Sequence, residues 1–230
     1  MKFDSTLKKC QLSTAVNVKN HNIQNDFELC RSFNCNHAID SNTKLIIVGT
    51  LTPPDGRKNG YFYSADGNGV YGLLDNYFSG NSNFLKLKEN LINTQVNKEQ
   101  CVEDIKKELK RFDIAFLDVI DYAIAPTNSP DDNYIQYFNL DYDSFKNVLD
   151  TLSDFNFVCT SKNAVEGLLC ILERFGIAVK NAEKYPIKLS YNNKSFNIDL
   201  VPQIVRNTKY NKDKIKNQKE HWNKILINYI

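Results

Sequence analysis

The sequence predicts a mixed α/β protein, a three-layer α/β/α sandwich whose central sheet is mainly parallel. Short apolar runs typical of buried strands recur along the chain, at residues 45–48, 113–120 and 155–160. Segments with apolar residues at helical spacing separate these runs, and this alternation favours the sandwich. The chain has 230 residues, 42% of them hydrophobic, which is enough to bury a core of this size.

The N-terminal 36 residues form an arm rich in Asn, Lys and Ser, with only short elements expected. Residues 37–230 form a single domain, the default for a chain of this length. Its first strand covers residues 45–48 and ends at Gly49. The run Pro53-Pro54-Asp55-Gly56 is expected to exclude further regular structure behind that strand.

The later elements follow from local patterns in chain order. A helix at residues 98–111 carries apolar side chains at helical spacing, with Asn97 as its expected cap. An Asn192-Asn193 pair within alternating apolar and polar residues indicates a hairpin at residues 187–201. The other expected elements are a helix at 71–78, strands at 113–120 and 155–160, a polar loop at 125–133, and helices from Ser144, at 162–175 and at 211–230.

Charge, hydropathy and cysteine content indicate which kinds of partner and cofactor the chain is expected to have. The net charge of +2 is too small to identify a nucleic-acid-binding protein by itself. No long apolar run or signal peptide is evident, so we expect a cytoplasmic monomer without membrane contact. The six cysteines contain no CxxC pair, and neither a metal nor another cofactor is predicted.

The loop behind the first strand combines aromatic side chains with an amide. Tyr61, Phe62, Tyr63 and Tyr71 lie within eleven residues of one another, around Asn68. Open α/β sheets bind ligands at the carboxyl ends of their strands, which is where this loop begins. Aromatic faces beside an amide therefore suggest a pocket for a flat heterocycle.

Three separated segments of the sequence resemble the uracil-DNA glycosylase superfamily, especially its mismatch-specific and hypoxanthine-type branches. The first joins residues 45–50 to Phe62-Tyr63-Ser64-Ala65-Asp66-Gly67-Asn68, followed by an aromatic residue and two leucines. The second contains Asp118-Val119 and the loop at 129–133, and the third is the strand-to-helix turn at 157–164. The resemblance implies a central four-stranded parallel sheet that holds DNA at the carboxyl ends of its strands. It also implies hydrolysis of the base–sugar bond of a flipped nucleotide.

The chain departs from the pattern of the superfamily at three places. Many members carry Asp or Asn in the first motif, where this chain has Leu51-Thr52. Thr160 matches a catalytic asparagine of the hypoxanthine-type branch. In the last motif, at residues 201–207, Pro202 is kept but the serines are not. Either the catalytic acid has moved, the substrate differs from uracil, or catalysis has been lost. The chain thus resembles a divergent member of the superfamily, whose base can be uracil, another deaminated base or a modified pyrimidine.

Two carboxylates are candidates for the catalytic acid that orients water and stabilises positive charge on the sugar. Asp118 ends an apolar strand at the ligand edge of the sheet, although an aspartate there can equally cap the next turn. Asp55 is the second candidate, and its alternative is ordinary turn chemistry in the Asp-Gly pair.

The resemblance also implies which residues bind the base and the phosphates. Phe62 and Tyr63 would stack on the base, or else fill a core beneath the loop. Asn68, Thr52 and Thr160 would contact its polar edge, although Asn68 can equally be a turn-forming asparagine. Phosphates favour hydroxyls, lysines and free N–H groups, and the expected DNA-binding residues are Ser161, Lys162, Gln203, Arg206, Asn207 and Lys209.

The resemblance and these candidate residues together predict a DNA glycosylase. We expect it to be monofunctional, because no well-placed lysine nucleophile is evident. DNA is the expected partner, and the pathway is either repair or defence against phage. The alternative function is a non-catalytic DNA- or nucleotide-binding protein on the same scaffold, which would bind DNA in a salt-dependent way without producing abasic sites.

Overall fold

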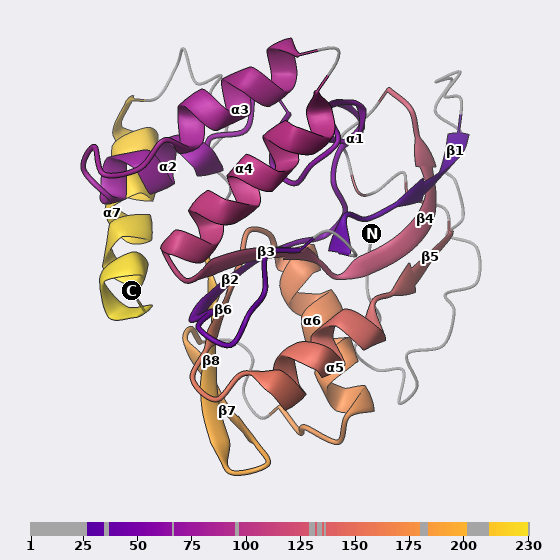
Figure 1. Ribbon diagram of the computed structural model, residues 1–230. Coiled ribbons are helices and arrows are strands. Elements are labelled where there is room, and N and C mark those ends of the chain that lie inside the picture. Colours follow the sequence, from indigo (N-terminus) through magenta and orange to yellow (C-terminus); the bar gives the residue numbers. More distant parts are fainter. Residues whose placement is uncertain are drawn as a thin grey trace.

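The computed structural model describes residues 27–34, 37–65, 67–94, 97–128, 132, 135, 137–179, 184–201 and 212–229, with side chains from residue 217 in the last range. The described chain forms a mixed α/β fold, as predicted, with two sheets (Figure 1). Its elements are β1 (Phe27–Arg31), β2 (Leu45–Gly49), α1 (Pro54–Asn59), α2 (Val70–Tyr77), α3 (Phe84–Asn93), α4 (Lys98–Arg111), β3 (Ile114–Asp118), β4 (Ile120–Pro126), β5 (Tyr137–Leu140), α5 (Tyr142–Thr151), β6 (Asn156–Cys159), α6 (Lys162–Arg174), β7 (Ile187–Tyr191), β8 (Lys194–Leu200) and α7 (Lys212–Tyr229).

The larger sheet has the strand order β3-β2-β6-β8-β7. The first four of these strands run parallel, and β7 is the antiparallel edge that forms the predicted hairpin with β8. The resemblance implied four strands, and the hairpin brings the number in this sheet to five. Strands β2 and β3 are completely buried, although β3 lies at the edge of this sheet, which explains why their sequences are apolar runs.

A second, antiparallel sheet was not predicted from the sequence. It has the order β1-β4-β5 and includes β1 from the N-terminal arm. The expected single strand at 113–120 is wrong, because the chain leaves the larger sheet after Asp118 and begins β4 at Ile120. Val119 makes this transition: its N–H donates to the backbone oxygen of Gly49, and its oxygen accepts from the N–H of Asp141.

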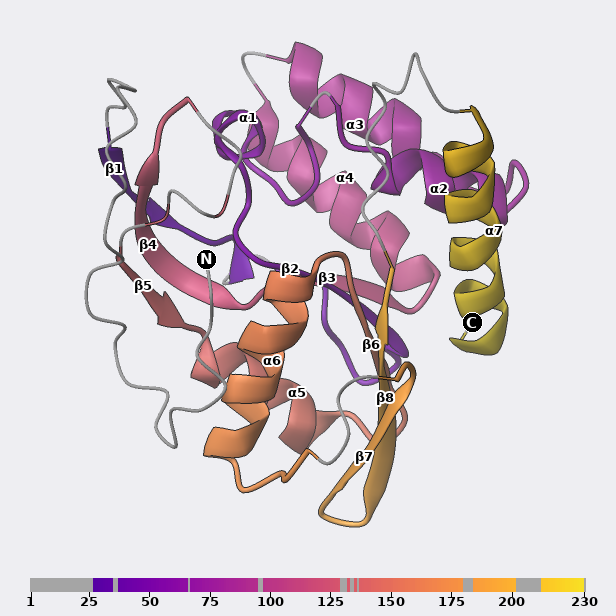
Figure 2. The ribbon, with the colours of Figure 1, turned by 180° about the vertical axis from the view of Figure 1, so that it is seen from behind.

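Hydrophobic cores lie on both faces of the larger sheet. Alternate residues of β2 point to opposite sides, with Ile46 and Val48 in one core and Leu45 and Ile47 in the other. The first core is closed by α5, α6 and the smaller sheet, and the second by α2, α3, α4 and α7 (Figures 1 and 2). The period of two places Asp118 on the second face, with Ile114 and Phe116.

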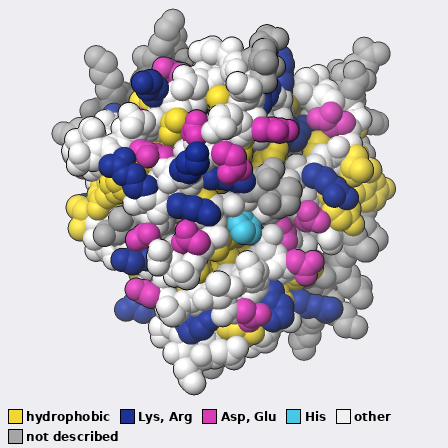
Figure 3. Space-filling model, in the orientation of Figure 1, with side chains coloured by type: hydrophobic (Ala, Val, Ile, Leu, Met, Phe, Trp, Pro, Cys, Tyr) yellow, Lys and Arg dark blue, Asp and Glu magenta, His cyan; other side chains and the backbone are white. Residues whose placement is uncertain are grey.

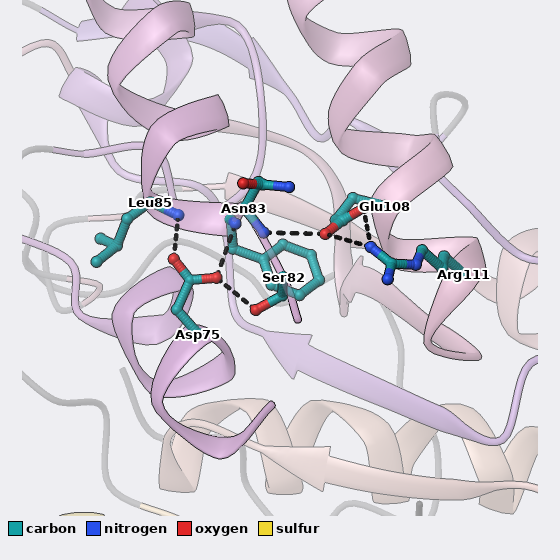
Figure 4. A network of polar contacts seen from close by, with 7 residues as sticks. Asp75, Ser82, Asn83, Leu85, Glu108 and Arg111 are labelled. Atoms are coloured by element: carbon teal, nitrogen blue, oxygen red, sulfur yellow. Dashed lines mark hydrogen bonds and ion pairs between the residues drawn. The ribbon is translucent and has the colours of Figure 1, made fainter. Parts of the chain in front are cut away.

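Polar contacts join three of the helices that cover the second core, α2, α3 and α4 (Figure 4). The Asp75 carboxylate of α2 accepts hydrogen bonds from the N–H groups of Phe84 and Leu85, and so caps the N-terminus of α3. Glu108 of α4 accepts from the N–H of Asn83 at the same helix end. These bonds fix α2, α3 and α4 relative to one another, beneath the loop that carries Tyr63.

The proline run does not exclude regular structure, so that prediction is wrong. Helix α1 begins at Pro54, where a proline is tolerated because the first N–H groups of a helix have no intrahelical partner. The helix ends at Gly60, which has a left-handed φ of 96°. Arg57 of α1 donates to the backbone oxygens of Thr52 and Pro126, and so ties the loop after β2 to the end of β4.

The basic residues of α4 lie on a surface of mixed charge (Figure 3). Lys106, Lys107 and Arg111 form ion pairs with acidic residues one turn earlier on the same helix. This surface is therefore an ordinary solvated helix face rather than a basic stripe for DNA. Within the described chain, no helix combines the length and apolar character needed to cross a bilayer.

Candidate active site

A pocket opens at the carboxyl ends of three neighbouring parallel strands. The chain enters the sheet at β2, adds β3 on one side and later β6 on the other, so the connections after β2 and β6 diverge. Such a switch point is where open α/β sheets bind ligands. The pocket has a volume of about 120 Å³, so it suits one small planar group rather than a large ligand. It is lined by Gly49, Thr50, Leu51, Thr52, Pro53, Tyr63, Asp118, Asp132, Thr160 and Ser161.

Asp118 is the buried acid of this pocket, with only 2% of its surface exposed. Its Oδ2 accepts hydrogen bonds from the N–H of Thr52 (2.8 Å) and from the Thr52 hydroxyl (2.7 Å). No described residue donates to Oδ1. Burial raises the pKa of Asp118 to about 7, although the two Thr52 hydrogen bonds act in the opposite direction. The carboxyl group is therefore able to hold or release a proton near neutral pH.

Asn34 holds the backbone of Asp118 from the side opposite the pocket. Its Oδ1 accepts from the Asp118 N–H (2.8 Å), and its Nδ2 donates to the Asp118 backbone oxygen (2.7 Å). The same Nδ2 donates to Oδ2 of Asp141 (2.6 Å), and Asp141 also caps α5 through the N–H of Ser144. The amide thus occupies the place of a neighbouring strand and fixes the end of β3.

Gly49 is required by the close approach of two side chains to the backbone of β2. A Cβ at this position would lie 2.5 Å from Asp118 Oδ1 and 3.1 Å from the hydroxyl oxygen of Tyr63. The two oxygens therefore border the same small space above Gly49. A larger residue would displace the Asp118 carboxylate from that space.

Tyr63 brings its hydroxyl oxygen to the space above Gly49 in the pocket. The side chain is 6% exposed, and its ring packs edge-on against Phe116 with the centroids 5.0 Å apart. The backbone has a left-handed φ of 52°, which is rare for an aromatic residue. The buried hydroxyl forms no hydrogen bond of good geometry with a described residue, although the Thr160 side chain lies close enough to act on its pKa in the downward direction. Burial raises the pKa of Tyr63 well above its usual value, and the nearby Asp118 adds to the effect.

The turn after β6 supplies further hydroxyls to the pocket wall. Thr160 donates its hydroxyl to the backbone oxygen of Val48, and Ser161 caps α6 by accepting from the N–H of Ala164. The Ser161 hydroxyl also bonds that of Thr50 (2.9 Å), which joins this turn to the loop after β2. Lys162 follows at the start of α6 and is exposed.

The structure brings together only part of the predicted site. Asp118, Thr52, Tyr63, Thr160 and Ser161 line one pocket, with Lys162 next to Ser161 in the chain. Of the predicted DNA-binding residues, Gln203, Arg206, Asn207 and Lys209 lie outside the described residues.

Three predicted site residues lie away from the pocket, which corrects their expected roles. Phe62 is fully buried between aromatic neighbours and has no surface free for stacking on a base. The Asn68 side chain accepts from the N–H of Val70 at the start of α2, as a turn-forming asparagine does. Asp55 is an exposed residue in the first turn of α1 and does not line the pocket.

Sequence reasoning missed two residues of the site. Asp132 lines the pocket, accepts a hydrogen bond from Asn163 and contributes to the raised pKa of Asp118. It lies in the Ser-Asp loop that the resemblance indicated, so that motif was sufficient to find it. Asn34 had no such signal, because it lies in the polar arm and is 84 residues before its partner.

The fold and the pocket define a class, an α/β protein with an acid site at the sheet switch point. The fold is similar to that of a solved structure, the solution NMR structure of a putative uracil DNA glycosylase from Methanosarcina acetivorans. The TM-score is 0.51 at 15% sequence identity, over 86% of this chain and 97% of that chain. At this identity the likeness is one of fold. Neither a protein-family model nor a curated protein matches the sequence.

Proposed function

We propose that the protein is a monofunctional DNA glycosylase, a divergent member of the uracil-DNA glycosylase superfamily related to its mismatch-specific and hypoxanthine-type branches. It flips a damaged or modified base out of DNA and hydrolyses the bond between that base and the sugar. The sequence motifs and the likeness in fold support this proposal together. The catalytic domain would comprise residues 37–230 together with β1 and Asn34 of the N-terminal arm.

The observation that carries the proposal is the Asp118 carboxylate. One of its oxygens is fixed by Thr52, and no described residue bonds the other in a pocket at the switch point. A buried acid whose pKa is raised to about 7 has the property expected of a proton-transfer group.

The chemistry follows from the charges that develop as the bond between C1′ and the base nitrogen breaks. The bonding electron pair leaves with the base, and positive charge builds on the sugar. The ionised carboxylate of Asp118 stabilises that charge and orients a water molecule towards C1′. As the water oxygen bonds C1′, its proton passes to Asp118.

The surroundings of the pocket suit a flipped nucleotide. The volume of about 120 Å³ accommodates a single base. The N-terminus of α6, capped by Ser161 and followed by the exposed Lys162, offers a phosphate a favourable helix end beside the pocket.

A base-release assay tests the proposal. Duplex and single-stranded oligonucleotides carrying uracil, hypoxanthine or a 5-substituted pyrimidine are incubated with the full chain, and abasic sites are cleaved with hot alkali. We expect strand cleavage for at least one of these bases and no cleavage before alkali. DNA binding without abasic product on every substrate would favour the non-catalytic alternative.

A further inference from the structure

We infer that Tyr63 is a second catalytic residue of the proposed glycosylase site, whose hydroxyl donates a hydrogen bond to an acceptor atom of the departing base. This inference rests on the proposed function. It assigns Tyr63 a role that differs from the stacking expected from the sequence, because the ring packs in a T-shaped contact with Phe116 and the hydroxyl oxygen borders the space above Gly49 in the pocket.

The Tyr63 hydroxyl is buried without a well-formed hydrogen bond to a described residue. Buried polar groups in folded proteins are almost always hydrogen-bonded, because burial without a partner costs free energy. This hydroxyl nevertheless belongs to a side chain that lines the pocket. A pocket ligand that carries an acceptor atom would satisfy it.

The backbone conformation of Tyr63 determines the direction of its side chain. A φ of 52° is unfavourable for an aromatic residue, so the surrounding structure must hold it in place. The oxygen of Phe62 accepts from the Tyr71 hydroxyl, and the oxygen of Ser64 accepts from Asn59. Lys88, buried in α3, donates to the backbone oxygen of Ala65. The loop is therefore fixed on both sides of Tyr63, and the hydroxyl is preorganised as a donor.

Tyr63 and Asp118 offer a neutral donor and a carboxylate to the same pocket. Their oxygens border the same space above Gly49 but are not bonded to each other. The raised pKa of Tyr63 keeps its phenol protonated, so it acts as a donor and not as a base. The negative charge that develops in this reaction lies on the base, and the positive charge lies on the sugar. A donor and a carboxylate at one small pocket match these two charges.

The step balances without a proton leaving Tyr63. The bond between C1′ and the base nitrogen breaks, and its electron pair moves onto the base and its acceptor atom, which the Tyr63 hydroxyl stabilises. The hydroxide part of water bonds C1′, and the water proton goes to Asp118. The released base anion takes a proton from solvent.

The test compares Tyr63→Phe with Tyr71→Phe as a matched control. Both changes remove one buried tyrosine hydroxyl from the same layer, but that of Tyr71 is bonded to Phe62 and that of Tyr63 has no well-formed hydrogen bond to a described residue. We expect Tyr63→Phe to lower the single-turnover rate of base release by about 100-fold, as the loss of one transition-state donor does. Its melting temperature should equal or exceed that of the wild type. Tyr71→Phe should melt lower and keep the rate within about threefold, since its hydroxyl only holds the loop.

Two further readouts separate catalysis from structure. Binding to an oligonucleotide with a tetrahydrofuran abasic site should be the same for Tyr63→Phe and the wild type, because no base is present to contact. Uracil and 5-fluorouracil should be released at more different rates by Tyr63→Phe, since an unassisted base depends more on its own acidity. A wild-type enzyme that releases no base from any probe would overturn the proposed function itself. An active wild type with Tyr63→Phe at the same rate would overturn only the role of Tyr63.

Discussion

Replacing Asp118 by asparagine should make the fold more stable at neutral pH, although it removes the proposed catalytic group. The pKa of this carboxyl is raised by burial from 3.8 to about 7, so the folded protein favours the neutral form. A pKa difference of one between the folded and unfolded states corresponds to about 1.36 kcal/mol, so a difference of about three corresponds to about 4 kcal/mol of stability. Asparagine is neutral at every pH and keeps an oxygen that can accept from Thr52.

Because the pKa of Asp118 is raised and not lowered, the stability difference between Asp118→Asn and the wild type should grow with pH. The stabilising contribution of a raised pKa is fully present below the unfolded value of 3.8, and it is lost as the pH rises through about 7. The free energy of unfolding of Asp118→Asn should therefore be close to that of the wild type at pH 4. It should exceed the wild-type value by about 4 kcal/mol at pH 8.

Urea unfolding of both proteins between pH 4 and pH 8 measures this difference, because the titration of all other groups cancels. The matched control is Asp55→Asn, an exposed carboxylate of α1 away from the pocket, which should differ from the wild type by less than about 0.5 kcal/mol at every pH. An Asp118→Asn protein that is no more stable than the wild type at pH 8 would refute the reasoning. A gain that does not change with pH would refute it as well.

Three further predictions concern the same site. The kcat/KM for base release should rise with pH and level off near pH 7, since the ionised form of Asp118 takes the proton from water; a profile that falls between pH 5 and pH 8 would be inconsistent with that role. Asn34→Ala should lower the free energy of unfolding by about 3 kcal/mol in urea titrations, because the N–H of Asp118 and the Asp141 carboxylate each lose a buried partner. A loss below 1 kcal/mol would show that water replaces the amide. Gly49→Ala should abolish base release and destabilise the protein by about 1–3 kcal/mol, because its Cβ would meet Asp118 Oδ1 at 2.5 Å; full activity would mean that the carboxylate can move without loss of function.

Local patterns were enough to predict several helices and the hairpin around the larger sheet. The helix at Lys98–Arg111 and the hairpin at Ile187–Leu200 have repeats that act over neighbouring residues only. These inferences need no knowledge of distant contacts.

The parts that were missed depend on distant contacts or on unusual backbone geometry. The smaller sheet forms because Cys30 of the arm pairs with Ala123 of β4, a pairing over more than 90 residues that neither segment signals. The direction of Tyr63 and Phe62 depends on a left-handed φ at Tyr63, which no sequence pattern for an aromatic residue indicates. Tertiary structure therefore decided which of the two aromatics borders the pocket.

The most direct measurement of the central claim is single-turnover base release by the wild type and by Asp118→Asn, with enzyme in excess and binding to the same oligonucleotide followed in parallel. We expect the wild type to produce abasic sites, and Asp118→Asn to bind the oligonucleotide at least as tightly while releasing the base at least about 100-fold more slowly. Equal rates for the two proteins would contradict the assignment of Asp118 as the catalytic acid.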